Sequence, residues 1–499
     1  MTTLAPQYTQ TRSFMTVVLI ELWERFGYYG MQALIVYFMV GPLKFEDSHA
    51  NLVWGACAAL IYVAPAIGGW IGDKVLGTRR TMIIGAVILT IGYALMAVPT
   101  ESTTFLFYSL GVVVVGNGLF KPNTGNLVRK IYEGDDSKID SAFTIYYMAV
   151  NVGSTFSMLL TPWIKEYVNT TYGGNLGWHV AFAACSAGLL VGLANIMVMR
   201  HTLDHIGSAP DALPVDKKKL LMVLAASGCA IVFSAMVLEH RELARAFVYL
   251  AGFVVLGIFI YLIQKSEPSE RAGLIAALVL TLQTVFFFIF YQQMSTSLSL
   301  FALRNVDLDQ QLFGIHLFTW DPAQYQALNA IWIMIMSPIL AIIYSKAGAA
   351  KKDLSIAAKF AIGFATVAIG FFIYGMSAQF AVGGKTSSWI MIAGYGLYSL
   401  GELLVSGLGL AMIARYVPAR MGGFMMGAWF VATGISQYLG GVVANYASVP
   451  KDITDPLQTM EIYTSLFNKL GFAAIACTLI ALSVLPLMRR LTDTHHSHN

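Results

Sequence analysis

Three ionisable side chains lie within an apolar segment near the start of the chain. The stretch IELWERFGYYG contains Glu21, Glu24 and Arg25. In a helix these residues share one face with Tyr28 and Gln32, because the five positions are spaced i, i+3, i+4, i+7 and i+11. Each charge at the middle of a membrane costs about 2.5–3.5 kcal/mol on insertion scales, so this face must look into protein or water. One arginine cannot neutralise two carboxylates, which favours ion or substrate binding over a structural salt bridge alone.

Two more charges interrupt apolar segments further along the chain. Lys121 lies in GVVVVGNGLFKPNTGNL, where Pro122 frees a backbone carbonyl and can kink a helix beside the charge. The alternative for Lys121 is a side chain that extends along the helix to the membrane surface. Glu402 lies in YSLGELLVSGLGLAM and is the only charge between Lys385 and Arg415 in the sequence. A carboxylate without a partner nearby in sequence is predicted to be functional.

Polar and aromatic residues accompany these charges. Asn151 and Tyr147 are one helical turn apart in FTIYYMAVNVGS, Asn329 precedes IWIMIMSPIL, and Trp429 lies in MGAWFVATG. Each either completes a binding pocket or makes an ordinary contact between helices. The ordinary contact is an interhelical hydrogen bond for Asn151 and core packing for Trp429.

The five interior charges suggest a ligand that carries both signs. Glu21, Glu24, Arg25 and Lys121 lie in the N-terminal half, and Glu402 lies in the C-terminal half. Three carboxylates and two cations sum to −1, so one added proton would bring the set to zero. We therefore expect a zwitterion to be bound and a proton to be coupled to it, without catalytic chemistry.

The composition indicates a protein that crosses a membrane many times. Of the 499 residues, 57% are hydrophobic and only 12% are charged, which is unusual for a soluble domain. Apolar runs of 18 or more residues recur along the whole length, as in transmembrane helices. The first 13 residues do not resemble a cleavable signal peptide. The net charge of +4 lies in short loops and does not indicate nucleic-acid binding. The four cysteines lie in apolar runs without metal-ligand spacing.

The apolar runs predict fourteen helices and an all-α fold. They are expected near residues 14–40, 51–75, 81–99, 104–128, 140–164, 178–200, 219–238, 244–264, 272–302, 324–345, 354–377, 387–414, 421–446 and 460–488. An even number of helices puts both termini on the same side. Loops on that side contain 20 Lys and Arg residues against about eight opposite, which predicts cytoplasmic termini.

The distribution of charge also divides the chain. The pair of helices within 219–264 has ionisable residues only around its turn, LEHRELAR, so we expect it to face lipid. Removing it leaves six helices on each side, as in transporters built from two six-helix bundles. The predicted parts are a cytoplasmic N-terminus, a first bundle, a linker with two extra helices, a second bundle and a cytoplasmic tail, at 1–13, 14–200, 201–271, 272–488 and 489–499.

One loop has a pattern that suggests gating. GGWIGDKVLGTRR has the form G-x-x-x-D-x-x-x-G-x-R-R and contains Asp73, Arg79 and Arg80. Asp73 could cap or pair with a neighbouring helix end and hold the protein closed from inside. The alternative is an ordinary basic loop.

Four of these motifs together resemble a known family. IELWERFGYYG, GNGLFKPN, YYMAVNVGS and GELLVSGLGLAM are similar to motifs of the proton-coupled oligopeptide transporter family, within the major facilitator superfamily. The Asp73 loop resembles the gating loop of that superfamily. The resemblance covers residues 14–488, includes the two-helix insert of bacterial members, and is strongest to enterobacterial di- and tripeptide permeases. It implies a major facilitator fold and a symporter that moves di- and tripeptides inward with protons.

The resemblance also implies roles for the site residues. Arg25 and Lys121 would hold the peptide carboxylate. Glu402 would hold its amino end, together with Asn151 and Asn329. The remaining pocket residues would be aromatic: Tyr29, Tyr62, Tyr147 and Trp429.

Proton coupling would follow from the acidic residues of the first motif. Glu21 and Glu24 would take part through pairing with Lys121. Two positions depart from the family pattern, since Gln32 replaces an arginine and Gln292 in FYQQMST replaces an acidic residue. The change preserves charge balance, so binding can survive it. It shifts the expected coupling route to the two glutamates and Lys121.

The same reading sets the expected partners. Peptides, protons and membrane lipid are expected, with no nucleic acid and no cofactor besides protons, and the chain is expected to work as a monomer in the bacterial inner membrane. One alternative is a facilitator of another organic anion, zwitterion or drug. A membrane enzyme is disfavoured because the sequence has no HExxH and no nucleophile elbow. A transport-inactive receptor would need a signalling domain, and no such segment is seen in the sequence.

Overall fold

The computed structural model describes residues 9–418 and 421–497 and is almost entirely helical there. The helices of the first half are α1 (Gln10–Val40), α2 (Asp47–Ile71), α3 (Thr78–Met96), α4 (Thr103–Ile131), α5 (Asp136–Tyr172), α6 (Leu176–Met199) and α7 (Lys217–Glu239). Those of the second half are α8 (Arg241–Lys265), α9 (Pro268–Tyr291), α10 (Ser297–Asn305), α11 (Ala327–Ala349), α12 (Ile356–Gly375), α13 (Ser388–Tyr416), α14 (Gly422–Ala444) and α15 (Pro456–Ser497).

Each of the fourteen predicted helices has a counterpart among these elements. Twelve helical segments of the described chain are long and apolar enough to cross a membrane. α1 is not among them, because its glutamates and Arg25 lower the mean hydropathy of its central part. α14 also falls outside the twelve, and it contains Ser436 and Gln437. α5 runs to Tyr172, past the predicted end near 164, because a helix can continue into water after its apolar part ends.

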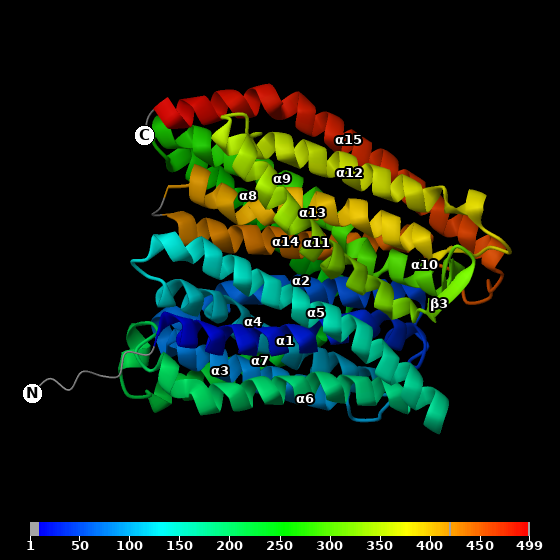
Figure 1. The fold of residues 1–499 in the computed structure, drawn as a ribbon. Helices are drawn as coiled ribbons and strands as arrows, with labels where there is room; N and C mark the ends of the chain where they lie inside the picture. The colour runs from blue at the N-terminus through cyan, green and yellow to red at the C-terminus, as the bar shows by residue number, and fades with distance from the viewer. Residues whose placement is uncertain (1–8, 419–420, 498–499) are drawn as a thin grey trace, which may run out of the picture. The chain divides into compact units, whose positions relative to one another are not determined.

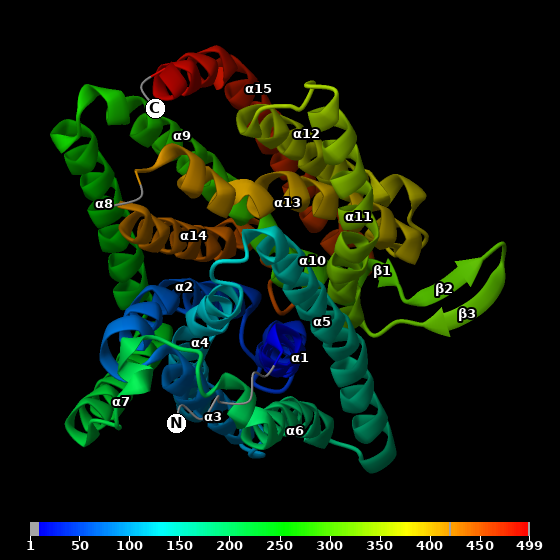
Figure 2. The ribbon, with the colours of Figure 1, turned by 60° about the vertical axis from the view of Figure 1, so that its left-hand side comes forward.

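Two departures from continuous helix were not predicted. The predicted helix 272–302 is interrupted by a 3-10 turn, η4 (Gln292–Ser295), before α10 begins. The segment after α10 forms an antiparallel hairpin of β2 (Asp309–Leu312) and β3 (Ile315–Thr319), which extends away from the helices that flank it in the chain (Figure 2). Short strands β1 (Val306–Asp307) and β4 (Thr386–Ser387) pair in parallel. The pKa of Asp309 is lowered, chiefly because Gln311 and then His316 donate hydrogen bonds to it.

The described residues form two compact units. Among the described residues, the first contains 9–34 and 60–240, and the second contains 35–59, 241–418 and 421–497. In the first unit α3 packs against α4 and α6, α4 also packs against α7, and α5 packs against α6 (Figure 1). In the second unit α12 packs against α13 and α15, while α9 contacts α13, α14 and α15.

The two extra helices belong to different units. α7 packs against α4 in the first unit, and α8 packs against α9 and α14 in the second. Other parts of the protein cover both helices poorly. In the most apolar 18-residue stretch of each helix, 28% is buried in α7 and 11% in α8. Large apolar side chains such as Leu221 and Phe253 are exposed on them. This exposure agrees with the expectation that the pair faces lipid.

A buried ion pair ties the start of α2 to the other elements of the second unit. Arg304 binds Asp47 through two hydrogen bonds of 2.6 and 2.9 Å, and the Tyr463 hydroxyl lies 2.6 Å from the same guanidinium. The Val449 amide also donates to Asp47, at 3.1 Å. The Asp47 side chain is 3% exposed, so its charge depends on these partners.

We expect reversal of either charge in this pair to destabilise the protein. Reversing one charge leaves its partner uncompensated and beside a like charge. We expect a cost of at least about 1–3 kcal/mol, which stays below that of a fully buried pair because Arg304 is partly solvated. Asp47→Arg and Arg304→Asp should each lower the apparent temperature of unfolding in detergent. The double exchange should recover part of the loss, and Asp452→Asn, at an exposed position, should change nothing. Wild-type unfolding in both single variants would contradict the expectation.

The linker after α6 caps α3. The carboxylate of Asp211 accepts hydrogen bonds from the backbone amides of Arg79 at 3.1 Å and Arg80 at 3.4 Å, and Ser208 Oγ accepts from the amide of Thr78 at 3.0 Å. Gly77 has φ +106°, and a Cβ there would lie 2.2 Å from the Asp211 carboxylate. The first amides of a helix have no partner within it, so Asp211 supplies a cap from a distant part of the chain.

We expect Asp211→Ala to loosen the linker without unfolding the protein. Loss of a helix cap costs about 0.5–2 kcal/mol, a local effect in a chain of this size. Amide hydrogen exchange within 200–216 and at the start of α3 should speed up, as should proteolysis of the linker. Asp204→Ala, at an exposed position in the same segment, is the matched control. Equal protection in the two variants would contradict the capping role.

Candidate functional site

The charged face of α1 is buried by close helix contacts. Glu21 and Glu24 are 0% exposed and Arg25 is 5% exposed. Gly30 allows this packing, because a Cβ there would lie 2.5 Å from Ser157 Oγ on α5. Gly153 on α5 has the same role, because its Cβ would lie 2.5 Å from a carbonyl oxygen of α1. The glycine that ends the motif IELWERFGYYG thus allows α5 to approach the charged helix.

Glu24 and Arg25 form one ion pair of the site. Arg25 Nε lies 2.5 Å from Glu24 Oε2, and Nη2 lies 2.7 Å from Oε1, which is a two-point contact. Arg25 Nη2 also donates to Asn117 Oδ1 on α4 at 3.1 Å. The guanidinium lies over the rings of Tyr28 and Tyr29, 4.7 and 5.6 Å from their centres. The implied pairing of Glu24 with Lys121 is therefore wrong in this structure, because Arg25 occupies both Glu24 oxygens.

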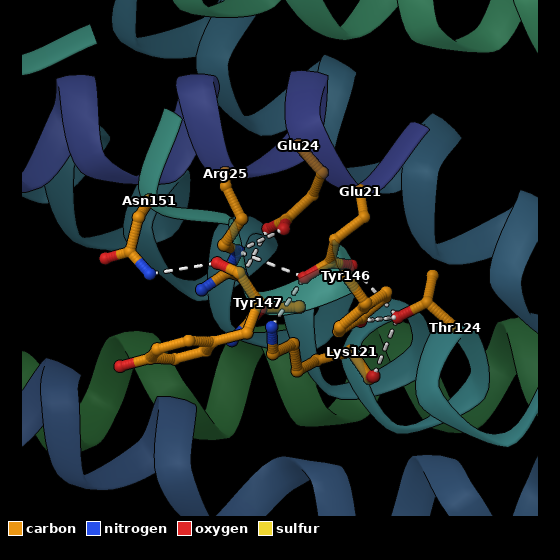
Figure 3. Close-up of polar contacts among 9 residues, drawn as sticks. Glu21, Glu24, Arg25, Lys121, Thr124, Tyr146, Tyr147 and Asn151 are labelled. Carbon is orange, nitrogen blue, oxygen red and sulfur yellow. Dashed lines mark hydrogen bonds and ion pairs between the residues drawn. The ribbon is translucent and has the colours of Figure 1, made fainter. Parts of the chain in front are cut away.

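Glu21 and Lys121 form the second ion pair, between α1 and α4. Lys121 Nζ lies 2.6 Å from Glu21 Oε1, and Arg25 Nε lies 3.8 Å from the same oxygen. The other oxygen, Oε2, accepts a hydrogen bond from Thr124 at 3.0 Å, and Thr124 contacts the Tyr146 hydroxyl at 2.8 Å (Figure 3). The predicted pairing of Glu21 with Lys121 is confirmed.

The four charges together are balanced. Two carboxylates face two cations, which resolves the excess negative charge seen when α1 is considered alone. The Lys121 side chain is 34% exposed, whereas the carboxylate of Glu21 is fully buried. A negatively charged ligand can therefore reach Lys121, and in doing so it competes with Glu21 for the ammonium.

Asn151 and Tyr147 on α5 lie beside this cluster (Figure 3). Asn151 is 5% exposed, and its Nδ2 donates to the carbonyl oxygen of Tyr147 at 2.9 Å, within α5 (Figure 3). Tyr147 is 42% exposed, and Tyr29 and Tyr62 are half-buried. This hydrogen bond of the Asn151 amide runs along its own helix and does not connect Asn151 to the charges.

The second unit contains a separate polar group around Glu402 on α13. Asn329 Nδ2 on α11 lies 2.6 Å from Glu402 Oε2 and 3.0 Å from Ser399 Oγ. Glu402 has no ion pair with a cation among the salt bridges of the described residues. The structure thus brings together Glu402 and Asn329, as the resemblance implied.

Three neutral residues at predicted positions, Trp429, Gln292 and Gln32, are buried. Trp429 is 5% exposed, packs edge-on against Phe288, and its indole N–H has no hydrogen-bond partner among the described residues. Gln292 begins η4, is 2% exposed, and its amide nitrogen likewise has no partner there. Gln32 is 9% exposed on α1. The two glutamine positions that depart from the family pattern are therefore both buried.

The predicted gating residues are spread around the start of α3. Asp73 lies in a π-helical turn, Gly72–Leu76, 4.0 Å from Lys130. Arg79 Nη1 donates to the carbonyl oxygen of Leu203 at 2.6 Å, and Arg80 Nη1 donates to that of Pro210 at 2.9 Å. Within the first unit the two arginines therefore hold the linker. The cap of α3 comes from Asp211, whereas Asp73 pairs with Lys130 in the last turn of α4, which is the predicted pairing with a neighbouring helix end.

Sequence reasoning missed several partners of the charges. Asn117, Lys121 and Thr124 are spaced i, i+4 and i+7 on α4, so helical periodicity could have shown that they share a face. Tyr146 follows from no such spacing, because it comes from another helix. The described residues contain no group of three or more His, Cys, Asp or Glu that could hold a metal ion.

Comparison with curated proteins and solved structures gives the chain its relatives. A model of the POT family matches residues 79–462. Dipeptide and tripeptide permease B of Aliivibrio fischeri is 40% identical over 484 residues, which cover 97% of this chain and 95% of the relative. Dipeptide and tripeptide permease A of Escherichia coli is 39% identical over 488 residues, with 97% and 94% coverage.

Solved structures agree with this result. A structure of tetrameric PepTSo2 is 70% identical with a TM-score of 0.89, covering 97% of this chain and 100% of that one. A peptide transporter POT in complex with sulfate is 28% identical with a TM-score of 0.81, covering 96% and 95%. These matches confirm the predicted fold class, an all-α polytopic membrane protein of the major facilitator type. The sequence motifs, the helical fold and these relatives all lead to one assignment: the chain belongs to the POT family.

Proposed function

We propose that the protein carries di- and tripeptides into the cell together with protons. The observation that carries the proposal is the charge-balanced cluster of Glu21, Glu24, Arg25 and Lys121, in which a partly exposed lysine side chain pairs with a buried carboxylate. The relatives named dipeptide and tripeptide permease support the substrate class. A further relative, 70% identical, comes from a study of substrate recognition in proton dependent oligopeptide transporters. These relatives are permeases, which supports a transporter rather than an enzyme.

Proton coupling follows from competition for Lys121. In the resting cluster Glu21 Oε1 holds the ammonium at 2.6 Å. A proton on Glu21 removes that attraction and releases Lys121 to bind the carboxylate of a peptide, beside Arg25. Proton binding and peptide binding then favour each other, and this mutual dependence is what a symporter requires.

The two ends of the peptide are recognised by different charges. Arg25 and Lys121 bind the carboxylate, and Glu402 with Asn151 and Asn329 binds the amino end. The aromatic residues Tyr29, Tyr62, Tyr147 and Trp429 line the space for side chains. Glu402 supports this assignment, because Asn329, which donates a hydrogen bond to it, is neutral and leaves its charge uncompensated. Alternating access then opens this binding site to one side of the membrane at a time, with Asp73, Arg79 and Arg80 in the gating loop.

The proposal includes the orientation of the protein in the membrane and its state of assembly. The protein lies in the bacterial inner membrane with both termini in the cytoplasm, as the excess of Lys and Arg in the corresponding loops indicates. Protons are the only coupling ion and no cofactor takes part. One chain is the transporting unit, since every charge of the mechanism comes from one chain. PepTSo2 has been seen as a tetramer, and a tetramer of complete transporters is compatible with this.

Uptake into proteoliposomes tests the proposal directly. Radiolabelled dialanine should accumulate when the outside is made acidic relative to the lumen, and an ionophore that collapses the proton gradient should stop accumulation. Unlabelled di- and tripeptides should compete, whereas free amino acids and N-acetylated dipeptides should compete weakly. Uptake that ignores the gradient would overturn proton coupling, and equal competition by unrelated anions would overturn the substrate class.

A further inference from the structure

The two oxygens of the Glu21 carboxylate have different surroundings. Oε1 contacts the Lys121 ammonium, and Oε2 contacts the hydroxyl of Thr124 (Figure 3). Glu21 and Thr124 are both 0% exposed, and Tyr146 beside them is 9% exposed. Water is therefore largely excluded from Oε2, and the protein itself must satisfy this oxygen in each of its protonation states.

The Thr124 hydroxyl lies between two acceptors. It is 3.0 Å from Glu21 Oε2 and 3.0 Å from the backbone carbonyl oxygen of Lys121, and it has one hydrogen to donate. Its third contact is the hydroxyl of Tyr146 at 2.8 Å. A hydroxyl can donate one hydrogen bond and accept two, so Thr124 can serve only one of the two acceptors at a time while it accepts from Tyr146.

We propose that Thr124 is a positioning residue that switches its hydrogen bond when Glu21 is protonated on Oε2. The proposal rests on the proposed function, because it concerns the same proton. When Glu21 is ionised, Thr124 donates to Oε2 and accepts from Tyr146. When a proton arrives from the aqueous phase, a new O–H bond forms at Oε2, and that O–H donates to Thr124 Oγ1. The Thr124 hydrogen then rotates to the carbonyl oxygen of Lys121.

No covalent bond breaks at Thr124 in this step. One proton is gained by Glu21, the threonine keeps its own hydrogen, and the Tyr146 hydroxyl keeps donating to Oγ1. Every polar atom on this side of the carboxyl group has a partner both before and after protonation. Lys121 loses its ionic partner at Oε1 in the same step, so its ammonium becomes available to a ligand.

The charged and titratable groups that face Glu21 come from three helices. Arg25 and Glu24 lie on α1, Lys121 lies on α4, and Tyr146 lies on α5. Arg25 is held by both oxygens of Glu24, and Lys121 contacts Oε1 alone. The contacts of Glu21 with Lys121 and Arg25 are both at Oε1, so Oε2 is the oxygen on which a proton meets the least electrostatic opposition.

An ordinary structural role makes a different prediction. Threonines within helices often donate to a carbonyl one turn earlier, and Thr284 on α9 does only this, at 2.8 Å from the Leu280 carbonyl oxygen. Thr284 is also 0% exposed, which makes it a matched control. If Thr124 were only such a residue, its removal would change stability and leave the pH dependence of uptake unchanged.

The experiment compares Thr124→Val, Thr124→Ser and Thr284→Val in proteoliposomes. Valine keeps the shape of the side chain. It removes the hydrogen bond that Thr124 donates to ionised Glu21 and the one that Thr124 accepts from protonated Glu21. The bond lost by the ionised form is the stronger one, so the pH midpoint of proton-driven uptake should rise by about 0.5–1 unit. Serine should restore the wild-type midpoint, and Thr284→Val should leave it unchanged. An unchanged midpoint in Thr124→Val would overturn the proposal.

An infrared titration gives a readout that does not need transport. The C=O stretch of protonated Glu21, assigned by its loss in Glu21→Gln, should move to higher frequency in Thr124→Val because its O–H has lost an acceptor. Thr124→Ala, a second variant in case valine impairs folding, should move the band in the same direction because it also removes the hydroxyl acceptor. Identical bands in the wild type and in both variants would sink the switch. Gradient-independent uptake by the wild type would instead refute the proposed function.

Discussion

Glu21→Gln is expected to uncouple peptide movement from protons. Glutamine keeps the size of the side chain and its contacts with Thr124, but it cannot ionise. Lys121 then faces no carboxylate at 2.6 Å, and the remaining Glu24, Arg25 and Lys121 sum to +1, as they do when wild-type Glu21 is protonated. We expect peptide uptake driven by an inward proton gradient to fall at least about tenfold, which corresponds to about 1.4 kcal/mol or more.

Exchange should survive in the same variant. Counterflow of labelled for unlabelled peptide requires binding and movement but no net proton transfer, so its rate should stay within about twofold of wild type. Peptide affinity, which in the wild type should weaken as Glu21 ionises, should become independent of pH. Glu239→Gln, an exposed glutamate on α7, is the matched control and should behave as wild type. Accumulation in Glu21→Gln that still follows the gradient would show that the proton binds elsewhere.

Glu402→Gln is expected to separate peptides by the charge of their amino end. The glutamine carbonyl can still accept the hydrogen bond that Asn329 donates to Glu402 at 2.6 Å. Only the negative charge is lost. Hydrogen bonds to charged groups contribute about 1.5–3 kcal/mol, so the apparent KM for a dipeptide with a free amino group should rise about 10- to 100-fold. An N-acetylated dipeptide, which carries no positive charge, should change less than about threefold.

The informative quantity is the ratio of the two effects. A general distortion of the site would weaken both peptides alike, whereas loss of a charge partner weakens only the free amine. Competition against one labelled dipeptide measures both in the same vesicles, and Glu461→Gln, at an exposed position on α15, serves as the control. Equal losses for the two peptides would remove Glu402 from the role of amino-end partner.

Much of the fold follows from the sequence because lipid imposes one rule. Most helices that cross lipid carry a long apolar run, so the fourteen helices and most of their ends could be located from the sequence. The hairpin of β2 and β3 could not be located in this way, because the apolar runs that predict membrane-spanning helices carry no information about the loops between them. The break at η4 was also missed, since Gln292 and Gln293 lie within a segment of suitable length.

The site was predictable as a set of residues and less so as a set of contacts. The burial cost of charge identified Glu21, Arg25, Lys121 and Glu402 without a structure. The division into two ion pairs was not predictable. Glu24 and Arg25 are neighbours on one helix, and their contact can be recognised only once the side-chain positions are known. The contacts of Arg79 and Arg80 were not predictable for a similar reason, since the linker that they bind lies far away in sequence.

The cap on α3 has a consequence for how the protein is made. Arg79 and the Asp211 carboxylate that binds its amide are separated by 132 residues. At a synthesis rate of about 5–20 residues per second, α3 leaves the ribosome roughly 7–26 s before its cap exists. During that interval the amides at its start must be satisfied by water or by the insertion machinery. The first unit therefore becomes complete only after α6 has been inserted and the linker has folded back, which sets an order of assembly during biogenesis.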